Sequence, residues 1–198
     1  MQLSYPAGPS IQAEKNALLY WASQFPYVAV YDNGASDIDR YGEYEFLLGV
    51  APEKASVFTQ AAQLSHLPST WLMGILSYEL KNTYEPKLHT HQRPWVNFPV
   101  VTLFEPEYVL ALKKNRQTWE CLKSPTDIEY PLNWKELLAD EGQFPPLGKA
   151  PEFRAMVNQS DYLATIEQLR NHIKAGDFYE INLAQAFVAE DVSIAPQA

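Results

Sequence analysis

The sequence predicts an α+β fold, a mainly antiparallel β-sheet sandwich with flanking helices, and three observations lead to this prediction. Short apolar segments separated by turn residues recur along the first part of the chain, which is typical of β-strands. Two longer segments repeat apolar residues at helical spacing. With 46% hydrophobic and 13% aromatic residues, the chain also has enough apolar surface to bury a substantial core.

The first predicted helix begins after Ser10, which can cap it, and continues to about Gln24. Pro26 follows and ends the helix. The apolar residues of the helix recur at the spacing of one face: Ala17, Leu18, Trp21 and Phe25.

Six segments of the first part are predicted as strands. Residues 44–50 are mostly apolar, so we expect this strand in the centre of a sheet. Residues 71–78 are the most hydrophobic stretch, which predicts a buried strand, and Gly74 marks a bulge or a close backbone approach. The other predicted strands are residues 27–31, 99–104, 108–113 and 118–123, the last two forming a hairpin.

Two connections of this part carry their own predictions. Residues 53–64 are predicted as a short helix, and residues 79–97 as a loop that contains Pro86 and Pro94.

A change in composition predicts two domains, residues 1–150 and 151–198. Residues 124–151 are rich in Pro, Asp and Glu and are predicted as a linker with one short helix at 134–139. An amphipathic helix capped by Ser160 then ends at Lys174, with Gly176 as its C-terminal cap and a strand at 178–188. Its apolar stripe consists of Tyr162, Ile166, Leu169 and Ile173.

Charge and cysteine content exclude several classes of protein. The net charge of -9 and the absence of a Lys/Arg-rich stripe argue against nucleic-acid binding. No apolar run reaches the ~20 residues that span a bilayer, so no membrane association is expected. The single cysteine, Cys121, predicts a buried or half-buried thiol and a reducing compartment, the cytoplasm.

No catalytic residue and no metal ligand is assigned from the residues themselves. His89 and His91 can face one side of an extended segment and ligate zinc, but nothing completes a ligand set, which favours a surface loop. The histidines are too scattered to support a Ser/His/Asp set.

The connection at residues 32–37 is a candidate binding loop. Aromatic residues on the following strand can stack on a planar ligand, and backbone groups at Asn33 and Gly42 can bind its polar ends. The alternative is an ordinary strand connection with half-buried tyrosines, Tyr41 and Tyr44.

The segment GDFYEINLAQAF, from Gly176 to Phe187, resembles a motif of the chorismate-utilising enzymes, which include anthranilate synthase component I and aminodeoxychorismate synthase component I. The preceding helix and the upstream segment GILSYEL are similar to family segments in the same order. The resemblance implies the fold of the N-terminal part of such an enzyme, with residues 1–150 as the N-terminal lobe. Residues 151–198 would begin the chorismate-binding lobe, and a strand that carries Tyr179 and Asn182 would join the lobes.

The chain departs from that motif at two positions. Glu180 stands where the family usually has Gln, and Ala186 where it usually has Arg.

The implied activity replaces the hydroxyl group of chorismate with ammonia from a glutamine amidotransferase, assisted by Mg²⁺. The stretch PYVAVYDNG and the lack of a Leu-x-Ser motif favour an aminodeoxychorismate synthase. Anthranilate synthase component I and a non-catalytic amino-acid-binding or amidotransferase-docking module remain alternatives. No position matches the family's catalytic or Mg²⁺-binding motifs, so this segment is expected to be inactive and to hold no cofactor.

The resemblance also implies a tryptophan effector pocket formed by Asn33, Tyr41, Gly42, Glu43 and Tyr44. Asn33 replaces the usual Ser, and Glu43 replaces a basic or small residue. A further expectation concerns residues 178–188, whose strand edge would be uncovered in this segment. Exposed strand edges favour association, which predicts a homodimer.

Overall fold

The computed structural model describes residues 3–34, 41–85, 87, 98–115, 117–125, 133–139 and 150–192. The chain divides into two compact units, Met1–Gln143 and Phe144–Ala198. The fold is α+β, as predicted, because helices flank sheets whose strand pairs are all antiparallel.

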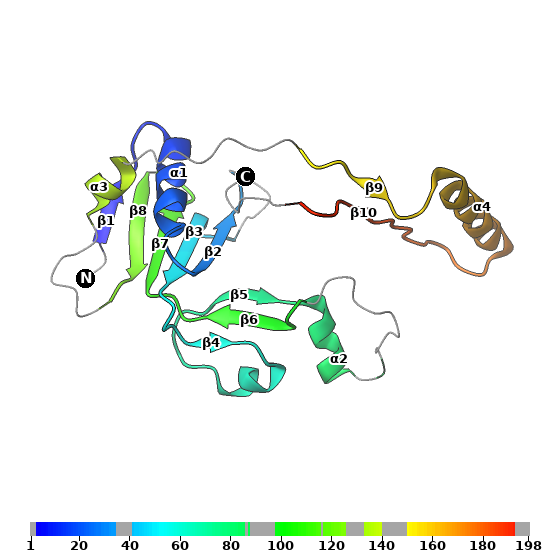
Figure 1. The fold of residues 1–198 in the computed structure, drawn as a ribbon, viewed down its shortest axis with the longest axis horizontal. Coiled ribbons are helices and arrows are strands. Elements are labelled where there is room, and N and C mark those ends of the chain that lie inside the picture. The colour runs from blue at the N-terminus through cyan, green and yellow to red at the C-terminus, as the bar shows by residue number, and fades with distance from the viewer. Residues whose placement is uncertain are drawn as a thin grey trace. The chain divides into compact units, whose positions relative to one another are not determined.

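The first unit contains a five-stranded sheet with the strand order β1-β8-β7-β3-β2 (Figure 1). Strand β3 lies inside this sheet, between β7 and β2, as its apolar sequence predicted. The hairpin of β7 and β8 also forms as predicted. The strands are β1 (Leu3–Pro6), β2 (Tyr27–Asp32), β3 (Tyr44–Ala51), β7 (Tyr108–Lys113) and β8 (Thr118–Lys123).

A three-stranded sheet with the order β4-β6-β5 belongs to the same unit. Its strands are β4 (Val57–Phe58), β5 (Met73–Leu76) and β6 (Val101–Phe104). Short helical segments flank the two sheets: α1 (Ile11–Ala22), η1 (Ala61–His66), η2 (Tyr78–Leu80), α2 (Lys81–Tyr84) and α3 (Trp134–Ala139).

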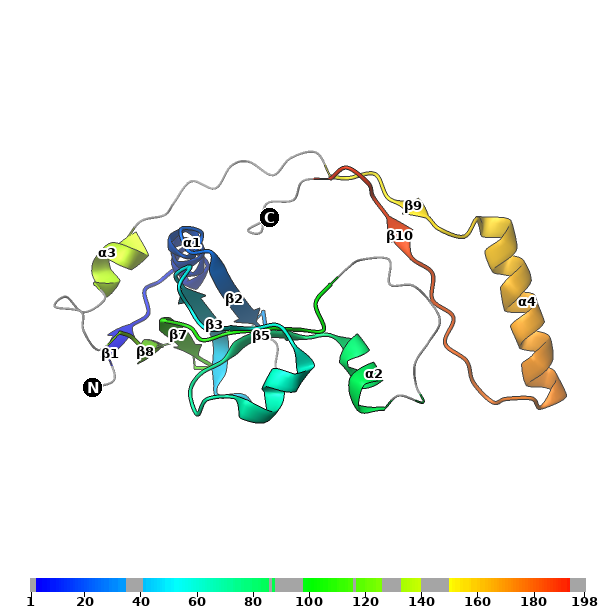
Figure 2. The same cartoon turned by 60° about the horizontal axis from the view of Figure 1, so that its bottom comes forward.

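Apolar clusters cover both faces of the five-stranded sheet, which gives the predicted sandwich. Figure 2 shows α1 lying above β3 and β7. One face packs on α1 and α3, and the other on the three-stranded sheet. Strand β3 shows the alternation that produces this division, since its side chains point to opposite faces in turn. The α1 face receives Phe46, Leu48 and Val50, and the opposite face receives Leu47 and Ala51.

Helix α1 begins as the sequence predicts. The Oγ atom of Ser10 accepts a hydrogen bond from the backbone N–H of Ala13 at 3.4 Å. Inside the helix, the buried carboxylate of Glu14 accepts hydrogen bonds from the backbone N–H of Gly8 at 2.7 Å and from Nε1 of Trp119 at 2.9 Å. The bond to Trp119 attaches α1 to strand β8, which lies next to β1, the edge strand opposite β2.

Three predictions, for two connections and for one strand of the first unit, were wrong. Residues 53–64 do not form one helix, because Val57 and Phe58 pair with β6 as β4 and η1 follows. Strand β5 is shorter than the predicted 71–78 and lies at a sheet edge, so Ile75 is 55% exposed. An apolar run cannot distinguish an edge strand from a central one. The expected loop at 79–97 includes the last two residues of η2 and the whole of α2 among its described residues.

Helix α3 occupies the predicted residues, but its role is more than that of a linker helix. Trp134 is buried in the cluster on the α1 face, where its ring centroid lies 6.4 Å from that of Trp119 and 6.4 Å from that of Tyr5. The predicted linker therefore contributes to the core of the first unit.

The second unit consists of α4 (Gln159–Ala175) and the antiparallel pair of β9 (Arg154–Ala155) and β10 (Phe187–Val188). Gly176 caps α4 in the left-handed conformation, as predicted, with φ 83°. The predicted N-terminal cap, Ser160, was wrong, because the side chain of Asn158 accepts the hydrogen bond from the backbone N–H of Asp161.

The strand predicted at 178–188 was wrong for most of its length. Of residues 178–188, all of which the structure describes, only Phe187 and Val188 pair with another strand. A strand requires a partner for its backbone groups, and alternating apolar residues do not supply one. Several large apolar side chains of the segment are exposed: Tyr179, Ile181, Leu183 and Phe187. Self-association through this segment stays a prediction.

Gly74 makes the close backbone approach that the sequence predicted. Its φ is 144°, and a Cβ atom there would overlap the carbonyl oxygen of Thr102 on β6. The hydroxyl group of Tyr31 on β2 donates to the Gly74 carbonyl at 2.8 Å and accepts from its N–H at 2.9 Å. This pair of bonds links an edge strand of each sheet.

We expect Gly74→Ala to lower the free energy of unfolding by about 2–4 kcal/mol, because it combines an unfavourable φ with a steric overlap. The matched control is Gly34→Ala, where φ is 61° and, chain neighbours aside, no atom of the described residues lies within 4 Å of the added Cβ. That substitution should cost only about 1 kcal/mol. Urea unfolding of both variants gives the comparison, and equal losses would show that the overlap is unimportant.

The thiol of Cys121 is buried, as predicted, and burial raises its pKa. Hydrogen bonds with Ser124 and with the carbonyl of Lys123, which accepts from Sγ at 3.2 Å, lower the pKa in part. The neutral thiol therefore favours the folded state below the ordinary cysteine pKa of about 8.5, and its contribution is lost as pH rises through the higher folded-state pKa.

At pH 8 we expect an alkylating reagent to modify Cys121 in the folded protein slower than in urea-unfolded protein by about tenfold or more. Mass spectrometry at timed intervals measures both rates. Equal rates would contradict the buried, thiol-form state of this side chain.

Candidate functional site

The residues predicted for the effector pocket lie at one end of the β2–β3 pair. Asn33 directly follows β2, and Tyr41, Gly42 and Glu43 lead into β3, whose first residue is Tyr44. Residues 35–40, which connect the two sides, lie outside the described residues. The strand register pairs Asp32 with Phe46, so both sides of the connection come from neighbouring strands.

Backbone hydrogen bonds order the described residues on both sides. The N–H of Asn33 donates to the carbonyl of Glu45 at 3.1 Å, which extends the β2–β3 ladder by one bond. The N–H of Lys114 donates to the carbonyl of Glu43 at 2.9 Å, which attaches the start of β3 to the β7–β8 hairpin. The candidate site is therefore attached to strand ends that backbone hydrogen bonds hold in place.

A buried ion cluster lies beneath these strand ends. Nζ of Lys15, a residue of α1, is 2.9 Å from Oδ1 and 3.1 Å from Oδ2 of Asp32, and 2.9 Å from Oε1 of Glu45. Only 4% of the Lys15 side chain and 2% of the Glu45 side chain are exposed. The ammonium group also lies 5.5 Å from the ring centroid of Phe46. One helix is thus joined to both strands that carry the candidate site.

The two tyrosines of the candidate site differ in their surroundings. Tyr41 is 98% exposed. Tyr44 is partly buried, and this burial raises the pKa of its hydroxyl group, followed by the nearby charges of Glu43 and Glu120. Lys113 opposes that shift, and its own hydrogen bond to Glu120, with an N–O distance of 2.9 Å, raises the pKa of the lysine. Of the two tyrosines, only Tyr44 therefore has its side chain partly packed against the protein.

The segment predicted to join the lobes has a different environment. Tyr179 and Asn182 are exposed, and among the described residues they lie outside any paired strand. Oε1 of Gln185, a few residues later, is buried and has no hydrogen-bond partner.

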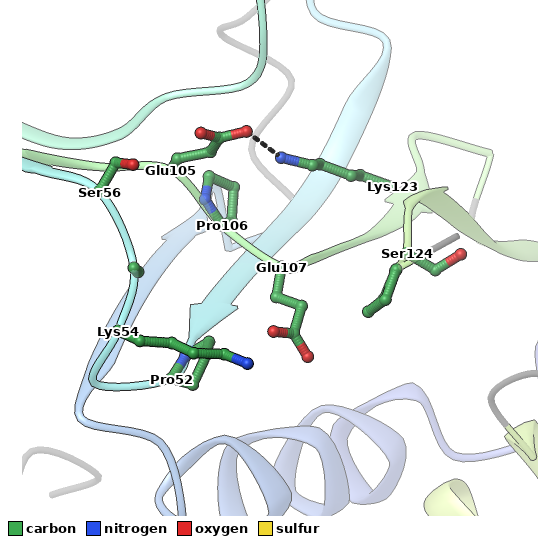
Figure 3. A pocket seen from close by; sticks show the side chains of 10 residues that line it. Pro52, Lys54, Ser56, Glu105, Pro106, Glu107, Lys123 and Ser124 are labelled. Atoms are coloured by element: carbon green, nitrogen blue, oxygen red, sulfur yellow. Dashed lines mark hydrogen bonds and ion pairs between the residues drawn. The ribbon is translucent and has the colours of Figure 1, made fainter. Parts of the chain in front are cut away.

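An open pocket of about 390 Å³ lies where β3, β6 and β8 end (Figure 3). Lys54 and Glu107 line it, together with Lys123 and Glu105, which form an ion pair at 2.8 Å. The hydrogen bond from Lys123 lowers the pKa of Glu105. Two positive and two negative side chains balance one another, so the pocket has no clear preference for a charged ligand.

Neither a metal centre nor a membrane-spanning element is found in the described part of the chain. No group of three or more His, Cys, Asp or Glu side chains there can hold a metal ion. The two histidines weighed as zinc ligands, His89 and His91, lie outside the described residues. None of the described helices combines the length and the apolar composition that crossing a bilayer requires.

Sequence reasoning missed the ion cluster of Lys15, Asp32 and Glu45. One signal was present in the predicted helix. Glu14 and Lys15 precede Leu18 by one helical turn, so they occupy the face that is otherwise apolar. Charged residues on a buried face require buried partners, although the sequence does not identify them.

The comparisons with known proteins bear on the whole chain. A family model described as chorismate binding enzyme matches residues 16–195. A comparison with curated proteins gave no match. The matched range includes the segment GDFYEINLAQAF and both sides of the candidate effector site. Because this range covers most of the chain, the protein belongs to the family of chorismate-binding enzymes.

Proposed function

We propose that the chain is the N-terminal part of an aminodeoxychorismate synthase component I. Such an enzyme aminates chorismate to 4-amino-4-deoxychorismate, a precursor of p-aminobenzoate and folate, with ammonia from a glutamine amidotransferase. A cytoplasmic location is compatible with the single reduced cysteine.

The observation that carries this proposal is the family match together with the motif from Gly176 to Phe187 inside it. The choice of subfamily rests on PYVAVYDNG, which forms β2 and the residues on either side of it. Anthranilate synthase component I, or another chorismate-utilising enzyme, is the alternative. A non-catalytic amino-acid-binding or amidotransferase-docking module is the alternative from another class.

Mg²⁺ is the cofactor that the proposed activity implies, where it would neutralise a substrate carboxylate. The described residues do not fit this ion, because no cluster of three possible ligands exists among them. In addition, the carboxylates of Glu45 and Glu105 already form ion pairs with lysines. The described residues therefore assign no ligand to Mg²⁺.

We expect the 198-residue polypeptide to leave chorismate unchanged when ammonia and Mg²⁺ are supplied, because none of its segments matches the family's catalytic motifs. The protein as its gene encodes it, with its amidotransferase, should form aminodeoxychorismate. Chorismate loss and product identity are measured by liquid chromatography against a no-protein control.

Three other outcomes of this assay would contradict the proposal or favour one of its alternatives. Chorismate loss with the 198-residue polypeptide above the control would contradict its proposed inactivity. Anthranilate as the product of the encoded protein would favour the alternative enzyme. No product from the encoded protein, with chorismate recovered in full, would favour the docking or binding module.

We also propose that the end of the β2–β3 pair binds an effector such as tryptophan. The observation that favours this second function is the partial burial of Tyr44 beside two strand ends that are fixed by hydrogen bonds. A tyrosine ring with one polar end can stack on an indole while nearby backbone groups bind its amino-acid part.

If this proposal holds, Tyr44→Ala in the encoded protein weakens tryptophan binding by about 10- to 100-fold, because a well-buried aromatic contact contributes about 1–3 kcal/mol. Tyr84→Ala, at an exposed tyrosine of α2, is the matched control and should bind normally. Calorimetry measures all three affinities. Unchanged affinity in Tyr44→Ala would return this end of the sheet to an ordinary strand connection.

A further inference from the structure

We infer that Lys15 is a positioning residue of the effector site, because its ammonium group fixes the two strand ends that carry Asn33 and Tyr44. The inference rests on the proposed effector function. It assigns to Lys15 an effect on ligand affinity without any contact with the ligand.

The contacts of Lys15 lie directly beside the candidate ligand-binding residues. Asp32 is the last residue of β2 and Glu45 is the second residue of β3. Each is the immediate neighbour of a candidate ligand-binding residue, Asn33 and Tyr44. Since Nζ of Lys15 contacts both carboxylates at 2.9 Å, one atom of α1 restrains both sides of the connection.

Hydrogen bonds transfer this restraint from the side chains to the backbone around Asn33. Oδ1 of Asp32, held by Lys15, also accepts a hydrogen bond from the N–H of Gly34 at 2.9 Å. On the other strand, the carbonyl of Glu45 accepts from the N–H of Asn33 at 3.1 Å. The peptide units on both sides of Asn33 are therefore oriented by residues that Lys15 holds.

The surroundings of Lys15 indicate that it positions the strand ends and does not bind the ligand directly. Lys15 is almost fully buried, and its ammonium group makes three contacts of 3.1 Å or less with carboxylate oxygens. An ammonium group has three donors, so these contacts match its capacity. Lys15 would therefore affect a ligand at the strand ends only by fixing the residues that the ligand contacts.

A substitution of Lys15 alone would have two effects at once, because it removes a positive charge as well as the link between the two strands. Lys15→Met leaves two carboxylates close together, and that of Glu45 is buried, so the substitution destabilises the fold as well as releasing the strand ends. Glu45→Gln removes the buried negative charge. The remaining carboxylate, Asp32, is 36% exposed and can be solvated. The double variant therefore isolates the loss of the link.

The experiment uses the encoded protein with Lys15→Met, and Lys15→Met combined with Glu45→Gln. The matched control is Lys123→Met, which breaks a lysine–glutamate pair at the other end of the sheet. Three quantities are measured: tryptophan affinity by calorimetry, stability by urea unfolding, and amide exchange at Asn33 and Gly34 by NMR. The amide of Leu112, inside β7, is the reference.

We expect the double variant to regain much of the stability lost in Lys15→Met while its tryptophan affinity stays about tenfold weaker than that of the unaltered protein, because the ligand must then order the strand ends itself. Exchange at Asn33 and Gly34 should be faster, with Leu112 unchanged. Lys123→Met should alter neither the affinity nor these amides.

Recovery of affinity and of slow exchange together with stability would overturn the inference, since Lys15 would then be structural only. If the unaltered protein binds no tryptophan, the effector function fails, and amide exchange decides about Lys15 by itself. Faster exchange confined to Asn33 and Gly34 supports its positioning role, and unchanged exchange overturns it.

Discussion

The arrangement of the first unit depends on how α1 is attached to the five-stranded sheet. Two adjacent charged residues of the helix, Glu14 and Lys15, are buried, and each has its partners on a different part of the sheet. Glu14 bonds to Trp119 of β8, and Lys15 bonds to Asp32 of β2 and Glu45 of β3. Burying a charge without a partner is costly, so only one placement of the helix satisfies both side chains. Apolar packing then fills the space between them.

The opposite face of the sheet is restrained in a different manner. Apolar residues there pack on the three-stranded sheet, and the hydroxyl group of Tyr31 bonds to both backbone groups of Gly74. The same tyrosine belongs to β2, which ends at Asp32 in the ion cluster. Strand β2 is therefore held from both faces, although it lies at the edge of its sheet. This double restraint is suited to a strand whose end carries the proposed binding site.

Much of this fold could be predicted because local patterns determine it. The cap at Ser10, the central position of β3, the β7–β8 hairpin and the close approach at Gly74 all follow from residues within a few positions. The predictions that were wrong needed information from distant residues. The exposed edge of β5 and the unpaired segment before β10 depend on which strands are available as partners. Asn158 and Ser160 are equally good caps, and geometry chose between them. At the candidate site, the sequence indicated the tyrosines but not Lys15, since its carboxylate partners lie 17 and 30 positions away.

The pairing of β1 with β8 has a consequence for biosynthesis. The hydrogen bond between Glu14 and Trp119 joins residues 105 positions apart, and β1 pairs with residues at similar separation. A ribosome delivers the amino-terminal end first, so the first helix and strand emerge long before β8 exists to receive them. Contacts of such long range are formed late and slow the folding of a domain. The apolar face of α1 must therefore remain without its partners from β8 until that strand has been synthesised, and chaperone binding would protect it in this interval.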